Sequence, residues 1–430
     1  MATPWARIGC GEPTRLGLSP VSVSKIRRPD SGTPPVYTDA AGFRTAARIL
    51  AEASGPIAMD AERASSFRYG ERAFLVQAKR EGTPAVLIAP EADRQACAEI
   101  LGPVLSGETW VLHSAHNDLA CLAELTMRPT TLLDTEIAAL LLQEPRTGLG
   151  FLLEENLGIV LDKAHSNEDW SRTPLPRQWV DYAALDVEYL LPLADIFVED
   201  LAAEGKTEFF AQENAHQLWL AAQPAAEKMW ADIKGASHID TAAGRRIAAA
   251  LEQWRQATGE QTDTSVQRLL PNKTLIALAA GGRGLRSPRE LKRMPLGHRI
   301  PANKMVEILQ IIDDAVASSD TPPPRRSGGD DTMVRYGRDP RVEALWEHFK
   351  RTADAVAEDY TVDRRCLPNV ATLKHLAVRL VVATENTATP AESVRDTVAR
   401  TLADHHARPW QHDALLDALT AAAHDMGYRD

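Results

Sequence analysis

The sequence predicts an α/β domain with a mixed β-sheet, followed by two all-helical domains. Three observations support this fold class. Short apolar runs separated by turn residues fill the region from 57 to 88, as expected for a meander of strands. Strand and helix patterns then alternate up to about residue 205, which is typical of an α/β domain. Beyond that residue the strand pattern fades and Ala-, Leu- and Arg-rich helical patterns take over.

Turn-forming residues separate the predicted elements from one another. Residues 1–35 carry Pro, Ser and Gly without hydrophobic periodicity and are interpreted as a flexible arm. An amphipathic helix is predicted over 40–53 and ends at Gly55-Pro56. A strand over 57–62 follows this turn. The pattern then predicts strands at 65–69, 73–78 and 85–88, a helix at 91–105, a strand at 109–113, a helix from 117, and a long helix at 176–203 with proline in its first turn.

Composition narrows the class of protein. The 430 residues exceed a single core, and the 44% hydrophobic and 25% charged content is that of an ordinary globular protein. No apolar run approaches the roughly 18 residues that span a bilayer, and residues 1–35 lack the apolar core of a signal peptide. The four cysteines lie far apart and suggest neither a zinc site nor a disulfide framework. We therefore expect a cytoplasmic protein with no membrane partner.

Two carboxylates end the strand Ile57-Ala58-Met59-Asp60-Ala61-Glu62. Because side chains alternate along a strand, Asp60 and Glu62 should point to the same face. Acids held together at the end of a buried strand repel each other, and a hard divalent cation with oxygen ligands would hold them. Taken alone, the pair is better explained as solvated acids at a strand end, because such pairs occur by chance in most chains.

Three more candidate positions lie downstream. Asp118 follows the strand 109–113, at the edge where α/β sheets place ligands, although Asn117 or Asp118 could simply cap the next helix. For Asp134 we favour capping, since nothing else there points to chemistry. Tyr182 and Asp186 are spaced i, i+4 and share one helix face. Considered singly, Tyr182 is better explained as a core aromatic residue and Asp186 as a surface acid.

Together these residues resemble the DEDD superfamily of 3′-to-5′ exonucleases, in the subclass whose last motif is Tyr-x-x-x-Asp, here Tyr182 to Asp186. The stretches Asp60-Ala61-Glu62, His113 to Leu119, Leu133-Asp134-Thr135, and Asp169-Trp170 with Arg172 make the region 36–205 similar to ribonuclease D. The resemblance implies a ribonuclease H-like fold for this domain.

The resemblance also implies roles. Asp60, Glu62 and Asp186 would hold one Mg²⁺ or Mn²⁺ ion, Asp60 would bridge to a second ion supported by Asp118, and the Tyr182 hydroxyl would orient the attacking water. Two such ions stabilise the charge that develops on the attacking and leaving oxygens of a phosphodiester.

The C-terminal half is divided by similarity and by linkers. After a connector at 206–240, the stretch around Leu270-Pro271-Asn272 resembles the helical HRDC domain, placed at 241–318. A Pro- and Gly-rich linker follows at 319–338. Cys366 to Asn369 echoes the same stretch and predicts a second HRDC-like domain at 339–425, and Arg408 to Gln411 resembles a late motif of actinobacterial-type ribonuclease D.

Basic residues gather in the first helical domain. Residues 273–304 hold eight Lys or Arg against one acid, Glu290, although the whole chain has a net charge of −11. Phosphate contacts dominate nucleic-acid affinity, so this stretch is a candidate RNA contact, with a solvated helix face as the alternative. The candidate RNA-binding residues are Arg283, Arg286, Arg289, Lys292 and Arg293.

The combined hypothesis is a metal-dependent 3′-to-5′ exoribonuclease that releases nucleoside 5′-monophosphates. Its expected substrate is RNA with a single-stranded 3′ end, such as a tRNA precursor. A DNA exonuclease of the Werner type and a non-catalytic RNA-binding scaffold are the alternatives. A third possibility is that the C-terminal tail mainly binds RNA-processing protein partners.

Overall fold

The computed structural model describes residues 25–162, 168–224, 229–281, 284–324, 331–385 and 392–429. Most of the predicted N-terminal arm (1–24), Arg283, and residues 325–330 of the predicted linker lie outside the described residues. Within the described part, no helix is long and apolar enough to cross a membrane.

A six-stranded mixed sheet forms the centre of the first domain, with the order β1-β4-β3-β2-β5-β6. Strand β2 pairs antiparallel with β3 and parallel with β5, so it lies inside the sheet. Strands β3 and β4 are antiparallel, whereas β1 with β4 and β5 with β6 are parallel. The strands span Val36–Tyr37 (β1), Ile57–Arg63 (β2), Ala73–Lys79 (β3), Val86–Ile88 (β4), Thr109–Leu112 (β5) and Thr131–Asp134 (β6).

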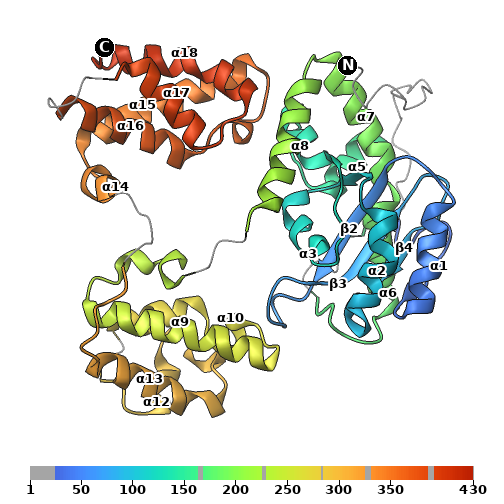
Figure 1. Cartoon of the computed structure of the whole chain (residues 1–430), viewed down its shortest axis with the longest axis horizontal. Coiled ribbons are helices and arrows are strands. Elements are labelled where there is room, and N and C mark those ends of the chain that lie inside the picture. Colours follow the sequence, from blue (N-terminus) through green and yellow to red (C-terminus); the bar gives the residue numbers. More distant parts are fainter. Residues whose placement is uncertain are drawn as a thin grey trace.

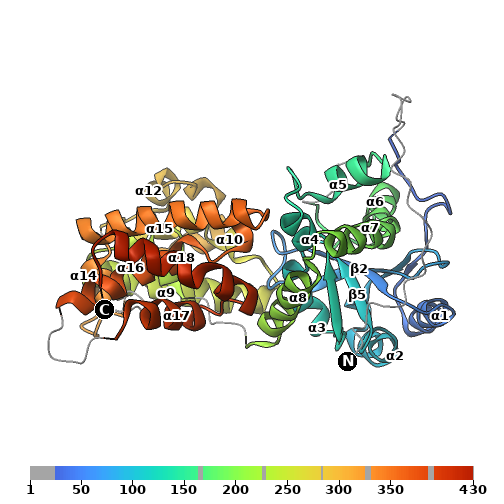
Figure 2. The same ribbon diagram turned by 90° about the horizontal axis from the view of Figure 1, so that it is seen from above.

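Helices cover both faces of this sheet (Figures 1 and 2). One apolar core unites one sheet face with α1, α2 and α3, and a second core unites the other face with α4 to α8. These helices span Ala40–Ala51 (α1), Arg94–Leu105 (α2), Leu119–Ala123 (α3), Thr135–Leu141 (α4), Leu149–Leu157 (α5), Arg177–Glu188 (α6), Leu190–Ala203 (α7) and Thr207–Ala222 (α8), with short 3₁₀ turns η1 at Pro90–Ala92 and η2 at Ala115–Asn117. The predicted mixed sheet is confirmed.

Three local predictions are wrong. Residues 65–69 form a turn instead of a strand, because the amides of Phe67 and Arg68 both donate to the carbonyl of Ala64. The predicted helix 176–203 is divided into α6 and α7. Pro192 explains the break, since it has no N–H for the carbonyl four residues earlier and its ring clashes with that carbonyl.

The third difference concerns the predicted connector at 206–240. Its first half forms α8, which packs against β6, α3 and α4 and therefore continues the α/β domain. The following residues 229–240 hold only the short 3₁₀ turns η3 at Trp230–Asp232 and η4 at Ala236–His238.

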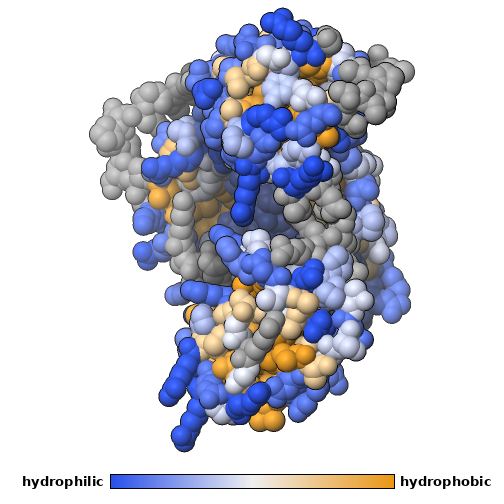
Figure 3. Space-filling view, turned by 90° about the vertical axis from the view of Figure 1, so that its left-hand side faces the viewer, coloured by the Kyte–Doolittle hydropathy of each residue, from blue (hydrophilic) through white to orange (hydrophobic). Residues whose placement is uncertain are grey.

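The first helical unit has an apolar core of its own, made by residues between Trp230 and Ala315. Figure 3 looks onto the two helical units and shows apolar residues gathered on the lower one, which is this first unit. Its helices span Ala242–Thr262 (α9), Val266–Leu269 (α10), Asn272–Gly281 (α11), Pro288–Arg293 (α12) and Met305–Ala317 (α13), with 3₁₀ turns η5 at Gly297–Arg299 and η6 at Ala302–Lys304.

The second helical unit shares its core with the α/β domain, because its buried residues belong to the same apolar cluster as α4 to α8. The four predicted amphipathic helices are present as α15 to α18. Its elements span Asp331–Tyr336 (α14), Pro340–Asp359 (α15), Arg364–Cys366 (η7), Val370–Glu385 (α16), Val394–Asp404 (α17) and Pro409–Asp425 (α18). The two helical units are thus attached to the α/β domain in different ways.

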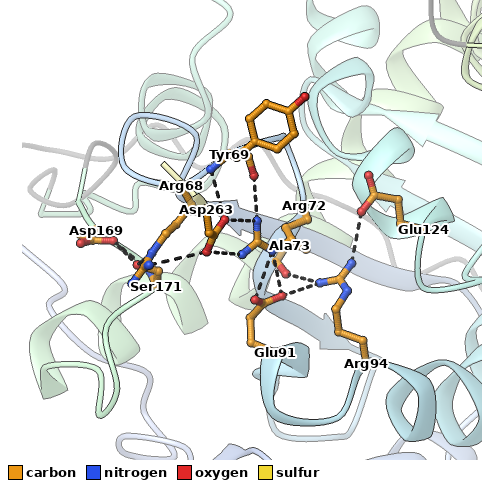
Figure 4. A network of polar contacts seen from close by, with 10 residues as sticks. All are labelled: Arg68, Tyr69, Arg72, Ala73, Glu91, Arg94, Glu124, Asp169, Ser171 and Asp263. Atoms are coloured by element: carbon orange, nitrogen blue, oxygen red, sulfur yellow. Dashed lines mark hydrogen bonds and ion pairs between the residues drawn. The ribbon is translucent and has the colours of Figure 1, made fainter. Parts of the chain in front are cut away.

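A polar network joins the first helical unit to the turn 64–72 that follows β2 (Figure 4). Arg72 donates two hydrogen bonds of 2.9 Å to Asp263, which ends α9 in a left-handed conformation with φ 47°. Arg72 also pairs with Glu91, and Arg68 donates to Ser171 at 2.9 Å. The turn next to the strand that carries Asp60 and Glu62 therefore positions the first helical unit.

Candidate active site

Strand β2 presents Asp60 and Glu62 on one face of the sheet, as predicted. Ile57 and Met59 are fully buried in the core beneath α1 and α2, whereas Ala58 belongs to the core on the opposite face. Asp60 and Glu62 share the register of Ala58 and therefore point toward the face that α6 covers. The apolar residues of the strand fix the direction of its two acids.

Helix α6 brings Tyr182 and Asp186 to the same place. Asp60, Glu62 and Asp186 each offer a carboxylate oxygen, and these three oxygens lie within 4.8 Å of one another. The Tyr182 hydroxyl donates a hydrogen bond to the Asp186 carboxylate, as their i, i+4 spacing allows. The face of α6 that carries these two side chains therefore meets the carboxylates of β2.

Asp118 approaches from β5, the strand beside β2. It is 4% exposed and precedes α3, yet its side chain makes no capping hydrogen bond. The capping alternative is therefore wrong for Asp118. The negative charge of Asp118 acts on Glu62 and that of Asp60 acts on Asp118, so this carboxylate belongs to the same electrostatic cluster.

Asp134 stabilises the turn at Ser114 and Ala115, which leads to Asp118. Its carboxylate accepts hydrogen bonds from the amides of Ser114 (2.9 Å) and Ala115 (2.8 Å), and Ser114 has a left-handed φ of 61°. Asp134 also caps α4 by accepting from the Glu136 amide at 2.9 Å, which confirms its predicted capping role. The sequence did not reveal the contacts across to Ser114 and Ala115, because they depend on the pairing of β5 with β6.

Burial and mutual repulsion dominate the electrostatics of the cluster. Burial raises the pKa of Asp60 to about 6. Burial, together with the charges of Asp60, Asp186 and Asp118, raises the pKa of Glu62 well above its usual value. Burial and the charge of Asp60 also raise the pKa values of Asp118 and Asp186. Burial likewise raises the pKa of Tyr182, so its hydroxyl stays protonated and acts as a donor.

This donor set fits a divalent cation. All the candidate ligand atoms are carboxylate oxygens, which Mg²⁺ and Mn²⁺ prefer over sulfur or nitrogen. A bound cation would also offset the repulsion that raises the carboxylate pKa values. The acidic cluster and the chemistry of its oxygens therefore indicate the use of divalent metal.

The metal-free protein should lose stability as the pH rises. Asp60 has a folded pKa of about 6 against an ordinary value of 3.8, so its contribution is present below about pH 4 and is lost as the pH rises through about 6. We expect Asp60→Asn, in EDTA, to raise the melting temperature by a few degrees at about pH 8 and by much less at about pH 5. Thermal denaturation of both proteins measures this, and equal shifts at the two pH values would contradict it.

An aromatic side chain from the segment that precedes α6 packs against two aromatic rings of this helix. The Trp170 ring lies 6.5 Å from the Tyr182 ring and 5.5 Å from the Trp179 ring, measured between centroids. The Arg172 guanidinium lies over Trp179 at 5.4 Å from its centroid. This packing explains why the Asp169-Trp170 and Arg172 stretch accompanies the Tyr182 motif in the sequence.

The four predicted basic residues that the structure describes lie apart from the carboxylates, on α12 and the turn before it (Figure 1). Arg286, Arg289, Lys292 and Arg293 are exposed. Arg286 pairs with Asp313 at 3.0 Å, which partly neutralises its charge. The structure therefore gathers the five predicted catalytic residues but places the predicted RNA contacts on a separate unit.

The chain is similar to known proteins in its α/β domain and beyond it. Residues 36–202 match the model of a family described as 3′-5′ exonuclease. Ribonuclease D of Sphingobium indicum is 30% identical over 257 residues, covering 57% of this chain and 64% of that protein. Two further curated relatives named ribonuclease D, from Gluconacetobacter diazotrophicus and Xanthomonas oryzae, are covered over 44% and 47% of their lengths. The chain thus spans less than two thirds of the length of these relatives.

Two solved structures are similar over most of the chain. A protein from Bifidobacterium adolescentis is 29% identical with a TM-score of 0.75, and the match covers 94% of this chain and all of that one. Escherichia coli RNase D, described as an exoribonuclease involved in structured RNA processing, is 21% identical with a TM-score of 0.66, covering 91% of this chain and 98% of that one. The latter match shows a shared fold, including the helical C-terminal region.

Proposed function

We propose that this chain, which is similar to ribonuclease D proteins over part of their length, is a metal-dependent 3′-to-5′ exoribonuclease that releases nucleoside 5′-monophosphates. The observation that carries the proposal is the meeting of three carboxylate oxygens, from Asp60, Glu62 and Asp186, within 4.8 Å. A fourth carboxylate, Asp118, lies in the same electrostatic cluster. This set matches the exonuclease chemistry of the family that residues 36–202 resemble.

Asp60, Glu62 and Asp186 would hold one divalent ion, and Asp60 with Asp118 would hold a second. Such ions stabilise the negative charge that develops on the attacking and leaving oxygens of the phosphodiester. The protein's own contribution is to fix the four carboxylates on rigid elements, β2, α6 and the turn after β5. Pre-positioned charge of this kind lowers the barrier because little reorganisation is needed during the reaction.

The Tyr182 hydroxyl would orient the attacking water, since burial keeps it protonated and it is held by Asp186. We expect Tyr182→Phe to lower kcat roughly 10- to 100-fold with little change in metal affinity, because a misplaced water costs rate rather than binding. Single-turnover hydrolysis and Mn²⁺ titration calorimetry measure the two quantities. A Phe variant with wild-type kcat would remove Tyr182 from the mechanism.

The basic surface of α12 would contact the RNA backbone. We expect the double variant Arg289→Ala with Lys292→Ala to weaken RNA binding and to reduce the salt slope of log Kd by about 1 to 2, because phosphate contacts release counterions. The matched control is Arg44→Ala with Arg48→Ala, which removes two exposed charges from α1. Equal affinities and slopes for the two double variants would favour the solvated-face alternative.

RNA, rather than DNA, is the proposed substrate, with a single-stranded 3′ end and a structured body such as a tRNA precursor. The curated relatives are ribonuclease D proteins, which does not favour a DNA exonuclease of the Werner type. The presence of all four carboxylates argues against a non-catalytic scaffold. The HRDC-like nature of the helical units, the binding of RNA-processing protein partners and a cytoplasmic location remain predictions.

A side-by-side digestion tests the proposed substrate. RNA and DNA oligomers of the same sequence are incubated with the protein and Mg²⁺, and the products are separated by chromatography. We expect nucleoside 5′-monophosphates from the RNA and slower or no release from the DNA. Faster digestion of the DNA would overturn the assignment to RNA.

A further inference from the structure

Gln77 is a buried polar residue directly beside the candidate metal ligands. It lies on β3 in register with Asp60 on the neighbouring strand β2. Residues directly opposite each other on antiparallel strands point to the same face, with their Cβ atoms about 4.5–5.5 Å apart. The Gln77 side chain therefore enters the same layer between sheet and α6 as the Asp60 carboxylate.

The Gln77 amide has no partner in the part of the chain that the structure describes. The residue is 0% exposed, and neither its Oε1 nor its Nε2 makes a hydrogen bond to any described residue. Burying an amide without a hydrogen-bond partner is unfavourable, whereas an apolar side chain of the same shape would carry no such cost. A glutamine at this position is therefore better explained by a polar partner at the site than by packing.

The neighbours of Gln77 on the same face narrow the choice of partner. Leu75, opposite Glu62, is fully buried and apolar. Lys79, opposite Ala58, is already engaged, because its Nζ pairs with Glu188 at 3.4 Å and donates to the Thr83 carbonyl at 2.6 Å. Two carboxylates remain as acceptors on this side of the sheet, because Glu188 on α6 also keeps a buried Oε2 without a hydrogen-bond partner among the described residues. Of the two, Asp60 is the one directly opposite Gln77 on the neighbouring strand.

We propose that Gln77 is a positioning residue for the metal site. Its side-chain N–H donates to the Asp60 carboxylate when Asp60 holds a divalent cation, and this fixes the orientation of the carboxylate. A ligating carboxylate that also accepts a hydrogen bond is held in one orientation, and loss of such a supporting partner typically costs 10- to 100-fold in metal affinity or activity. This inference rests on the proposed metal-dependent function.

The test compares Gln77→Met with Leu75→Met. Both variants place a methionine on the same face of β3, but only the first removes an amide. Mn²⁺ binding is measured by titration calorimetry, the metal-free melting temperature by thermal denaturation, and RNA hydrolysis across a Mn²⁺ series. We expect Gln77→Met to raise the Mn²⁺ dissociation constant roughly tenfold and to regain most of its kcat at saturating Mn²⁺, with Leu75→Met close to wild type.

The outcomes separate this inference from the proposed function. If the wild type binds Mn²⁺ and Gln77→Met binds it equally well, Gln77 has no positioning role, whether its melting temperature rises or falls. If the wild type binds no Mn²⁺, the proposed function itself fails, and the role of Gln77 with it.

A crystal structure of the wild type with Mn²⁺ gives a reading that does not depend on any variant folding. An Nε2–Oδ distance of about 3.2 Å or less between Gln77 and Asp60 supports the proposal. An amide turned to Glu188 instead overturns it.

Discussion

Replacing Asp60 by asparagine is expected to reduce RNA hydrolysis by at least about 10³-fold while the protein stays folded. Asp60 carries one of the three oxygens that lie within 4.8 Å, and its charge acts on Glu62, Asp118 and Asp186. Asparagine keeps the shape of the side chain but removes the charge that would bind the cation. Asp186→Asn should behave in the same way, because Asp186 belongs to the same set of oxygens.

Three measurements separate loss of chemistry from loss of structure. Circular dichroism and thermal denaturation report folding, titration calorimetry reports Mn²⁺ binding, and hydrolysis of an end-labelled RNA reports activity. Glu99→Gln on α2 serves as the control, because it removes an exposed carboxylate from a helix on the sheet face opposite α6. Wild-type turnover in either Asp60→Asn or Asp186→Asn would contradict the assignment of the site.

The second large effect is expected at Glu213, where the second helical unit docks on α8. This carboxylate accepts hydrogen bonds from Arg408 Nε (2.8 Å), Trp410 Nε1 (2.8 Å) and Gln411 Nε2 (3.1 Å). Glu213 is 9% exposed, and burial raises its pKa although the Arg408 charge opposes the shift. Its removal leaves three donors without their acceptor and the Arg408 charge unpaired.

We expect Glu213→Ala to cost about 3–5 kcal/mol, because breaking a buried ion pair leaves an uncompensated charge. The melting temperature should fall by several degrees, and limited proteolysis should cleave between the catalytic domain and the second helical unit faster. Glu208→Ala on the same helix is the matched control, since Glu208 is exposed and its carboxylate accepts a hydrogen bond from Gln212 of the same helix. A Glu213 variant as stable as this control would show that the docking does not depend on the buried carboxylate.

The residues of the candidate site could be predicted because their positions follow from local periodicity. The period of two along β2 places Asp60 and Glu62 on one face, and the i, i+4 spacing on α6 places Tyr182 beside Asp186. Asp118 could be predicted because a residue just after a strand lies at the edge of the sheet where ligands bind.

Other features depend on contacts between distant segments. The amide contacts of Asp134 require β5 and β6 to pair, and the position of Gln77 requires the register between β2 and β3. Neither can be inferred from the residues within one segment. The break between α6 and α7 is different, because it follows from a single residue. Pro192 disfavours helix in the preceding turn and therefore predicts the break from the sequence alone.

The most direct test of the proposed reaction is a time course on one RNA labelled either at its 3′ end or at its 5′ end, with Mg²⁺ or with EDTA. A metal-dependent 3′-to-5′ exoribonuclease releases the 3′ label at once as a mononucleotide, while the 5′ label stays on strands that shorten progressively. EDTA should stop both processes, and added Mg²⁺ should restore them. Release of the 5′ label first, internal fragments from either substrate, or undiminished hydrolysis in EDTA would contradict the account.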